Sequence, residues 1–378
     1  MARKFLQSKV GQAGSLARQE ILRIVPYVGG RSFDEMRRLY GKKVWLKVAS
    51  NENPLGPSPL AMAAMRKAVR EANIYPEQDY PLLKAGLAAR FGLKPANIFL
   101  GDGTSEIIVL VASAFLRRGD EAVMATPSFV MHDHGVIAAG AKLVKVSLDQ
   151  DWKTDLQALA RAVTRRTKVV FVCNPNNPTG TVVGKGEFEA FLKALPSGVV
   201  VVVVEAYAEF CTDKAFPNTV KYVKRGLPIL VLRTFAKLNG LAGLRVGYAL
   251  GAADLVGVLD RLRQPFNVST MAYRAATAAL KDRAFERKTV RNVVRGRKQL
   301  AKGFAKLRLP WIPSEANFMM VCVGDGVGIF QALLREGVIV RPLGVTRMKA
   351  WIRITVGTPP QNSRVLRALG KVMRAVRG

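Results

Sequence analysis

The chain has 378 residues, 49% of them hydrophobic and 8% aromatic, so it is long enough for two domains with a sizeable core and needs no disulfide support to fold. Its 59 Lys and Arg against 27 Asp and Glu give a net charge of +32, which favours small anionic ligands and non-specific adhesion to polyanions. Because the basic residues are spread along the chain and no RNA-binding signature is present, we expect no specific nucleic-acid partner.

The cysteines and the apolar runs disfavour several other classes of protein. Cys173, Cys211 and Cys322 are far apart and form no C-x-x-C pair, which argues against a disulfide scaffold and a structural zinc site. No apolar run approaches the roughly 20 residues that cross a bilayer, and the N-terminus lacks the apolar stretch of a signal peptide. We therefore expect a cytoplasmic protein without a membrane partner.

The first 76 residues combine helical spacing with two turn-rich motifs. Residues 15–40 have helix-like spacing and include the sequence I-V-P-Y, which ends at Tyr27. Residues 48–59 read V-A-S-N-E-N-P-L-G-P-S-P, and so many helix and strand breakers predict an ordered loop. A helical stretch at 60–72 then leads to Tyr75 and a proline.

A candidate anion site follows. A predicted strand at 97–100 runs into the turn G-D-G-T-S-E and then into an apolar helical pattern at 107–116. The first N–H groups of a helix have no partner within it and point outward, so this order of elements favours an anion near Thr104 and Ser105.

The next part alternates strands with helices. We expect strands at 121–125, 142–148, 168–173 and 199–204, and helices at 156–163 and 185–195. Six consecutive valines form the last of these strands, as is typical of a strand buried on both faces of a parallel sheet. His132 and His134 have no third ligand at a suitable spacing, so we interpret them as loop or packing residues and expect no metal.

Residues 232–247, which read L-R-T-F-A-K-L-N-G-L-A-G-L-R-V-G, lie between predicted strands at 228–233 and 246–250. They bring an amine, a hydroxyl and a guanidinium onto one short glycine-containing loop, at Lys237, Thr234 and Arg245. An amine that can bond to an aldehyde, beside two groups that can hold a phosphate, suits a phosphorylated aldehyde.

The C-terminal third changes character. From about residue 255 the pattern becomes helical, and a bridge at 261–270 leads into a long basic helical region at 271–307. Short strands (317–323, 338–340, 351–356) and helices (328–335, 363–376) then predict a small α+β domain. We expect an N-terminal arm and part of the small domain at 1–50, a large α/β domain at 51–262 and the small domain at 263–378.

These motifs resemble, in the expected order, those of the fold-type I aminotransferases that use pyridoxal 5'-phosphate, and most of all the histidinol-phosphate aminotransferase branch. The resemblance implies an α/β fold with a large, doubly wound, mainly parallel sheet domain and a small α+β C-terminal domain. It also implies a homodimer with composite active sites. The implied reaction, a step of histidine biosynthesis, exchanges an amino group between L-histidinol phosphate and 2-oxoglutarate and yields imidazole-acetol phosphate and L-glutamate.

The resemblance also assigns roles to individual residues. Lys237 would bond to the cofactor as a Schiff base and then move the proton at the reacting carbon as the catalytic residue. The other residues expected to bind the cofactor are Thr104, Ser105, Phe129, Asn177, Tyr207, Thr234, Arg245 and, from the neighbouring subunit, Tyr75. Those expected to bind substrate are Tyr27, Asn51, Arg341 and Arg353.

One departure from the family bears on activity. The family has Asp-Glu-Ala-Tyr at the end of the valine strand, and this chain has Val204 in place of the aspartate. A carboxylate there keeps the pyridine nitrogen protonated, so that the ring can accept electrons. Glu205 cannot replace it, because adjacent strand residues point to opposite faces. We expect severely reduced transamination with the bond to Lys237 retained. Smaller departures are Ala236 and Pro360.

Three alternatives remain open at this stage. An aromatic amino acid aminotransferase would keep every cofactor residue and differ around Tyr27 and Arg341. A decarboxylase of threonine phosphate would share the scaffold and release CO₂. A catalytically silent relative would bind pyridoxal phosphate or a partner protein, and Val204 and the high positive charge favour it.

Overall fold

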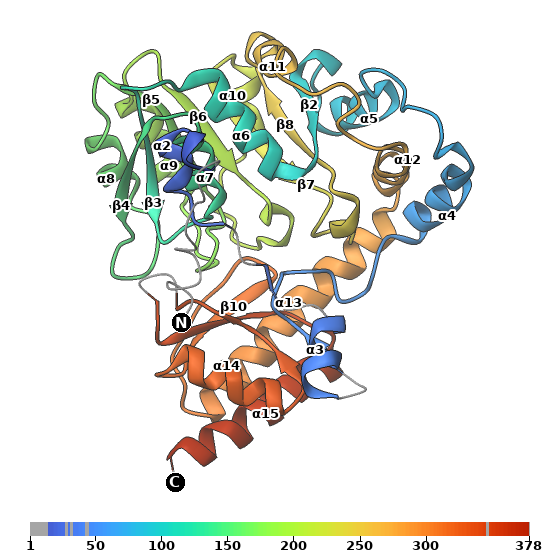
Figure 1. The fold of residues 1–378 in the computed structure, drawn as a ribbon, viewed down its shortest axis with the longest axis vertical. Helices are drawn as coiled ribbons and strands as arrows, with labels where there is room; N and C mark the ends of the chain where they lie inside the picture. The colour runs from blue at the N-terminus through green and yellow to red at the C-terminus, as the bar shows by residue number, and fades with distance from the viewer. Residues whose placement is uncertain (1–13, 27–28, 31–32, 42–44, 345–347, 378) are drawn as a thin grey trace.

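The computed structural model describes residues 14–26, 29–30, 33–41, 45–344 and 348–377. Its centre is a seven-stranded sheet in the order β2-β8-β7-β6-β5-β3-β4 (Figure 1). The strands are β2 (Ile98–Gly101), β3 (Glu121–Thr126), β4 (Lys142–Ser147), β5 (Thr167–Cys173), β6 (Val200–Val204), β7 (Ile229–Thr234) and β8 (Gly247–Gly251). Only β8 runs antiparallel to its neighbours, β2 and β7. The predicted mainly parallel sheet is confirmed.

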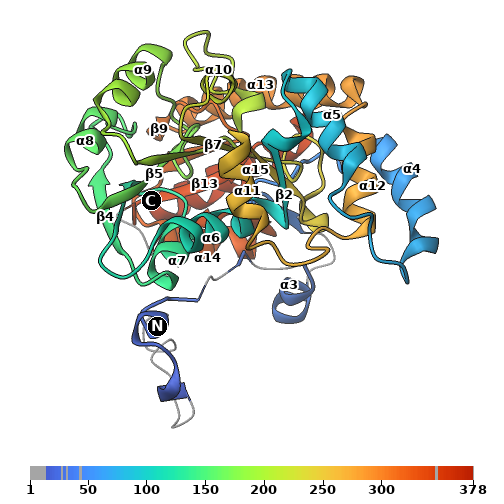
Figure 2. The ribbon, with the colours of Figure 1, turned by 90° about the horizontal axis from the view of Figure 1, so that it is seen from above.

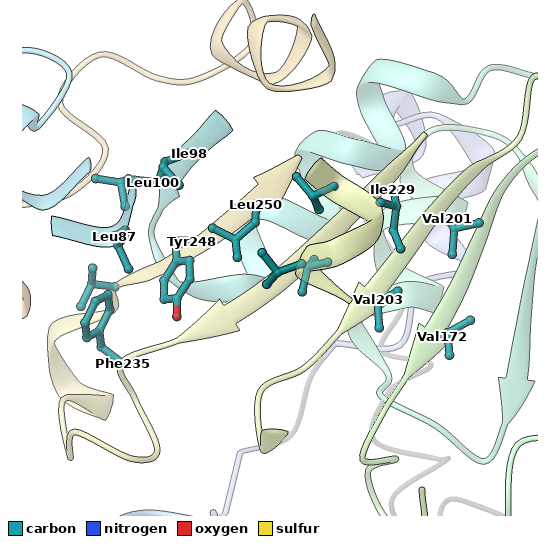
Figure 3. Close-up of a cluster of buried hydrophobic side chains, with 14 of the residues drawn as sticks. Leu87, Ile98, Leu100, Val172, Val201, Val203, Ile229, Phe235, Tyr248 and Leu250 are labelled. Carbon is teal, nitrogen blue, oxygen red and sulfur yellow. The ribbon is translucent and has the colours of Figure 1, made fainter. Parts of the chain in front are cut away.

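The valine strand β6 explains where the core lies. All five residues of β6 are buried, and they alternate between the two faces of the sheet. Val201 and Val203 belong to one hydrophobic cluster, in which they lie near Ile229 (Figure 3), whereas Val202 and Val204 belong to a second cluster on the other face. Complete burial of a valine side chain contributes about 1.5–3 kcal/mol, so β6 stabilises both layers.

Helices cover both faces of this sheet, as Figure 2 shows from above. They are α5 (Pro81–Phe91), α6 (Gly103–Phe115), α7 (Met131–Ala138), α8 (Leu156–Arg161), α9 (Lys185–Ala194), α10 (Val220–Lys224), α11 (Ala253–Asp260) and α12 (Thr270–Ala279), and α4 (Pro59–Ala68) packs on α12 at the edge of the molecule. The side chain of Ser58 caps α4 by accepting a hydrogen bond from the backbone N–H of Ala61 and donates another to Asp282 over 2.6 Å.

A smaller sheet lies beyond the central one. Its strands, in the order β12-β13-β10-β9, are β9 (Trp311–Ile312), β10 (Phe318–Cys322), β12 (Arg341–Pro342) and β13 (Trp351–Thr355), and β1 (Leu46–Lys47) pairs separately with β11 (Val338–Ile339). The long helix α13 (Arg283–Lys306) runs between the two parts (Figure 1), and α14 (Gly326–Arg335) and α15 (Pro359–Arg377) pack in the smaller one. Two short N-terminal helices are α2 (Gln19–Leu22) and α3 (Phe33–Tyr40).

The structure adds detail to two sequence-based expectations. The helical region expected at 271–307 consists of two helices, α12 and α13, because Asp282 starts a new helix by accepting a hydrogen bond from the N–H of Phe285, and residues 261–269 of the bridge are not helical. His132 and His134, expected to be loop or packing residues, lie in α7, and His132 is buried. Tyr27 lies outside the described residues, and the domain boundaries stay a prediction. Within the described ranges, no helix has both the length and the apolar composition to cross a bilayer.

Candidate active site

A cavity of about 120 Å³ opens at the carboxyl ends of the parallel strands, where ligands of open α/β sheets bind. It is lined by Thr104, Ser105, Phe129, Cys173, Asn177, Val204, Ala206, Tyr207, Thr234, Ala236, Lys237 and Arg245. The structure thus brings together eight of the residues predicted to bind the cofactor, Lys237 among them. A larger cavity of about 270 Å³ between α5 and α12 is lined by none of them.

Lys237 lies in the loop after β7 and projects into this cavity. Its Nζ donates a hydrogen bond to the carbonyl of Ser50 over 3.1 Å. Burial and, after it, the positive charge of Arg353 lower the pKa of Lys237 to about 8, while Glu52 opposes the shift. About a tenth of this amine is therefore neutral and nucleophilic at pH 7.

The loop that carries Lys237 packs closely against the loop at residues 51–56. Gly240 has φ +71° and its α-carbon faces the backbone of Gly56 so closely that a β-carbon would overlap the Gly56 carbonyl. The side-chain amide of Asn53 donates to the carbonyl of Leu238 over 2.9 Å. This close approach of two backbones holds the lysine loop in place.

An anion cradle forms at the start of α6. Thr104 and Ser105 lie in its first turn, where backbone N–H groups lack helical partners. The guanidinium of Arg245 lies against Gly103, whose φ of +70° and missing β-carbon make room for it. Arg245 is itself in the left-handed region at φ 54°, a strained conformation of the kind found at ligand sites. These groups suit a phosphate.

The hydroxyl of Tyr207 accepts side-chain amide hydrogen bonds from Asn51 over 3.1 Å and from Asn177 over 3.5 Å. Arg353 orients Asn177 by donating to its Oδ1 over 2.6 Å, and Arg353 also donates to the carbonyl of Ala49 over 2.9 Å. Asn51 has a φ of 57°. Four of the predicted residues thus form one connected network at the mouth of the loop 51–56.

The wall at the end of β6 is apolar. Val204 lines the cavity beside Cys173, its register partner on β5. Glu205 is fully buried on the opposite side, where it accepts hydrogen bonds from Arg233 over 2.9 and 2.7 Å and from Thr219 over 2.6 Å. The expectation that Glu205 cannot take the place of a carboxylate at position 204 is confirmed.

His132, interpreted from the sequence as a packing residue, is buried with neither ring nitrogen hydrogen-bonded. It stacks on Phe171 at 4.6 Å between ring centroids, and burial lowers its pKa to about 3, so the ring is neutral. Cys173, two residues after Phe171 on the same face of β5, is the register partner of Val204. The unpartnered histidine therefore packs on Phe171, two strand positions before the residue that pairs with Val204.

The remaining predicted residues lie elsewhere. Tyr75 is 77% exposed, stacks on Phe266 at 4.5 Å and does not line the cavity. Arg341 on β12 is the antiparallel register partner of Arg353 on β13, so the two side chains share one face of the small sheet. Sequence reasoning missed Cys173 and Ala206 as wall residues and the carbonyl of Ser50 as the acceptor for Lys237, although the position of Cys173 at the carboxyl end of a predicted parallel strand was a usable signal.

The residues present fit pyridoxal phosphate at three of its edges. Lys237 would bond to the aldehyde, the anion cradle would hold the phosphate, and Tyr207 and Asn177 would hydrogen-bond the ring oxygen. At the fourth edge, the ring nitrogen would meet the apolar side chain of Val204. The cavity therefore offers polar groups that would bind the cofactor, but no carboxylate that would keep its ring nitrogen protonated.

Comparison with known proteins agrees with this geometry. The family model for aminotransferase class I and II matches residues 43–369. A histidinol-phosphate aminotransferase of Moorella thermoacetica is 42% identical over 358 residues, covering 94% of this chain and 92% of the relative, and histidinol-phosphate aminotransferase 2 of Pseudomonas aeruginosa is 43% identical over 362 residues, 95% of this chain and 98% of the relative. The crystal structure of a histidinol-phosphate aminotransferase from Sinorhizobium meliloti in complex with pyridoxal-5'-phosphate superposes with a TM-score of 0.87 at 28% identity, covering 96% of this chain and 98% of that one.

Proposed function

Because this chain belongs to the class I and II aminotransferases, and within them to the histidinol-phosphate aminotransferases, we propose that it exchanges an amino group between L-histidinol phosphate and 2-oxoglutarate. The products are imidazole-acetol phosphate and L-glutamate. The observation that carries the proposal is the convergence of Lys237, the anion cradle and the Tyr207 network on one cavity. The relatives do not favour an aromatic aminotransferase or a decarboxylase of threonine phosphate.

The cofactor of this enzyme class is pyridoxal phosphate, which when bound supplies an aldehyde that carries the amino group and a ring that accepts electrons from the substrate carbon. We assign Thr104, Ser105 and Arg245 to its phosphate, since they surround the start of α6. Thr234 lines the same side of the cavity from the end of β7. Phe129 supplies a flat ring for stacking.

Lys237 acts as the proton carrier. Its lowered pKa leaves part of the amine neutral at pH 7, so it can accept a proton at the substrate carbon and return it to a neighbouring atom. The hydrogen bond to the carbonyl of Ser50 fixes the direction of the side chain. Tyr207 and Asn177 hold the oxygen edge of the ring in place with their hydroxyl and amide groups.

Two arginines on one face of the small sheet explain a preference for anionic substrates. We assign Arg353 to the carboxylate of glutamate, because a guanidinium pairs with a carboxylate through two parallel hydrogen bonds. Arg341, its cross-strand neighbour, is assigned with Tyr27 to the phosphate of histidinol phosphate. Asn51 closes this side through its hydrogen bond to Tyr207.

We further propose that the active enzyme is a homodimer. Tyr75 is exposed beside other exposed apolar side chains, among them Ile74 and Phe266, and it lies outside its own cavity. A partner subunit that covers this surface would receive Tyr75 at its own cofactor phosphate. The three free cysteines are consistent with a reducing, cytoplasmic location, which is part of this proposal.

Val204 lowers the rate of this chemistry without abolishing cofactor binding. With no carboxylate at the ring nitrogen, the ring accepts electrons poorly, and Glu205 is committed to Arg233 and Thr219. We therefore propose a slow aminotransferase rather than a silent binding protein, because Lys237 and its supporting groups are intact.

Single-turnover absorbance of the purified protein loaded with pyridoxal phosphate tests the function. Histidinol phosphate, added without an acceptor, should remove the absorbance of the lysine-bound cofactor and release imidazole-acetol phosphate in stoichiometric amount. Phenylalanine and threonine phosphate are tested in parallel as alternative substrates. Lys237→Ala, which cannot form the bond between lysine and cofactor, is the control. A faster turnover of phenylalanine, or CO₂ from threonine phosphate, would contradict the proposed substrate, and no turnover of any amine would favour a binding protein.

A further inference from the structure

The positive charge of the chain is concentrated in its last quarter. Residues 283–378 contain 20 Lys and Arg and four Asp and Glu, a net charge of +16, which is half of the +32 of the whole chain. The helix α13, which Figure 1 shows as the long orange helix between the two parts of the molecule, carries much of this charge. Its cations do not line the candidate active site.

Six of these cations form a basic stripe on the exposed face of α13. They repeat at three- or four-residue intervals and are Arg287, Arg291, Arg295, Lys298, Lys302 and Lys306. The opposite face of the helix is apolar and buried, with Phe285, Val293, Leu300 and Phe304 in the core. At 1.5 Å per residue the stripe is about 28 Å long.

The basic stripe has no charge compensation in the part of the chain that the structure describes. The one acidic residue of α13, Glu286, is buried and bound to Arg90 and Arg283. None of the six stripe residues forms an ion pair with a described carboxylate. Like charges four residues apart on a helix repel each other and destabilise it. Alternating acidic and basic residues would have made the same face equally soluble without this repulsion. The stripe therefore suits an external polyanion better than it suits solvent.

We propose that the basic stripe is a docking surface for the phosphate backbone of a nucleic-acid duplex, bound without sequence selectivity. Double-stranded DNA presents one negative charge per roughly 1.7 Å of its axis, so 28 Å of duplex offers about 16 phosphates to a straight row of six cations. Long arginine and lysine side chains can reach phosphates from a rigid helix without entering a groove.

The exposed face of α13 is less suited to two other polyanions, a single-stranded nucleic acid and an anionic membrane. A single strand is held largely by stacking of its bases on aromatic rings, and both aromatic residues of α13, Phe285 and Phe304, are buried. A membrane-bound helix inserts its apolar face into lipid, and the apolar face of α13 is already covered by the core. Charge without exposed apolar or aromatic groups fits a regular phosphate backbone.

The test is fluorescence anisotropy of a labelled 30-base-pair duplex with the full-length, cofactor-loaded protein between 50 and 300 mM salt. If about five phosphates are contacted, the logarithm of the association constant should fall with the logarithm of salt concentration with a slope of about −4.5. A duplex of unrelated sequence should bind within about twofold, since no base edge is read.

A matched pair of variants locates the site. The stripe variant changes Arg287, Arg291, Arg295, Lys298 and Lys302 to Gln. The control variant changes five exposed cations outside α13, Arg118, Arg165, Lys193, Lys221 and Arg225, to Gln. Both lose five positive charges. We expect the stripe variant to bind at least 30-fold more weakly at 100 mM salt with a much flatter salt slope, and the control to change less than threefold. If both variants keep the absorbance of the bound cofactor, their fold is intact.

Three outcomes would overturn the proposal. Equal loss in the two variants would mean that the overall charge, and not the stripe, attracts the duplex. Stripe-dependent sedimentation with vesicles containing 30% anionic lipid, without stripe-dependent duplex binding, would assign the surface to a membrane. Tighter binding of a single strand than of the duplex would assign it to unpaired nucleic acid.

Discussion

We expect the residue at position 204 to set how well the active site accepts electrons. Val204→Asp places a carboxylate at the cavity wall where the ring nitrogen of the cofactor is expected, so the ring should become protonated. We expect the single-turnover rate with histidinol phosphate to rise at least a hundredfold, which corresponds to about 2.7 kcal/mol of activation free energy. Stopped-flow absorbance measures this rate, and Val204→Asn, which has nearly the same shape as the aspartate variant but no charge, is the control.

An unchanged rate in Val204→Asp would mean that the ring nitrogen is not protonated from this position. Loss of cofactor binding in the same variant would instead mean that the apolar wall is required for binding.

His132 offers a way to accommodate that new carboxylate. Its ring is neutral and carries one N–H, and neither nitrogen has a partner in the structure. We expect His132→Phe alone to leave stability unchanged or to raise it, because it removes a buried unpaired polar group. In the Val204→Asp background the same change should cost about 2 kcal/mol more, since the carboxylate loses its donor. Urea denaturation of the present chain, the two single variants and the double variant gives this coupling energy. A coupling energy near zero would mean that the histidine does not interact with the new carboxylate.

The lowered pKa of Lys237 predicts how its reaction with the cofactor depends on pH. Its pKa is lowered to about 8, so the neutral amine predominates above pH 8 and falls about tenfold per pH unit below it. The rate at which the cofactor-free protein bonds to pyridoxal phosphate should therefore rise with pH with a midpoint near 8. Arg353→Met removes a positive charge that disfavours the protonated amine, so the midpoint should move upward. A midpoint that stays in place would show that the charge of Arg353 does not lower the pKa of Lys237.

At the scale of elements, the contact between two loops is expected to limit stability. Gly240→Ala forces a side chain into a left-handed conformation and against the carbonyl of Gly56, which is backbone and cannot yield. We expect a loss of at least about 2 kcal/mol in the free energy of unfolding. The control is Gly186→Ala in α9, where a β-carbon meets no atom and should stabilise the helix slightly. Urea denaturation compares them, and equal stability would show that the loops can separate.

The strands of the central sheet were predictable because each has a dense run of apolar residues between turn signals. The valine run became β6, and its alternation between two clusters was foreseeable from the period of a strand. The break between α12 and α13 was not foreseen, because both helices have the same periodicity and only the cap at Asp282 separates them.

The candidate site was predictable to the extent that its residues lie in sequential motifs. Lys237, Thr234 and Arg245 share one loop, so their meeting needed no tertiary information. The common face of Arg341 and Arg353 depends on the register between β12 and β13, and the unpartnered nitrogens of His132 depend on the packing of α7 over β5. The spacing of residues in the sequence gives neither the register between strands nor the packing of a helix on a strand.

At the scale of the whole molecule, the proposed homodimer would form through the exposed apolar side chains near Tyr75. Val69, Ile74, Tyr75, Leu82 and Phe266 are between 41% and 77% exposed, more than a monomeric surface usually leaves as a group. If this surface is the dimer interface, it also delivers Tyr75 to the partner's cavity, so association and cofactor binding should be coupled.

Ile74→Asp tests this coupling, because an acidic group at the centre of an apolar contact would have to lose its hydration on association. We expect the variant to sediment as a monomer at micromolar concentrations and to bind pyridoxal phosphate at least tenfold more weakly, since each cavity lacks its partner's Tyr75. Val327→Asp, an exposed apolar residue on α14, is the matched control and should remain dimeric with unchanged affinity. A monomeric Ile74→Asp protein that keeps full affinity would remove Tyr75 from the cofactor site, and a variant that stays dimeric would place the interface elsewhere. Sedimentation velocity and cofactor absorbance, measured on the same samples, distinguish these results.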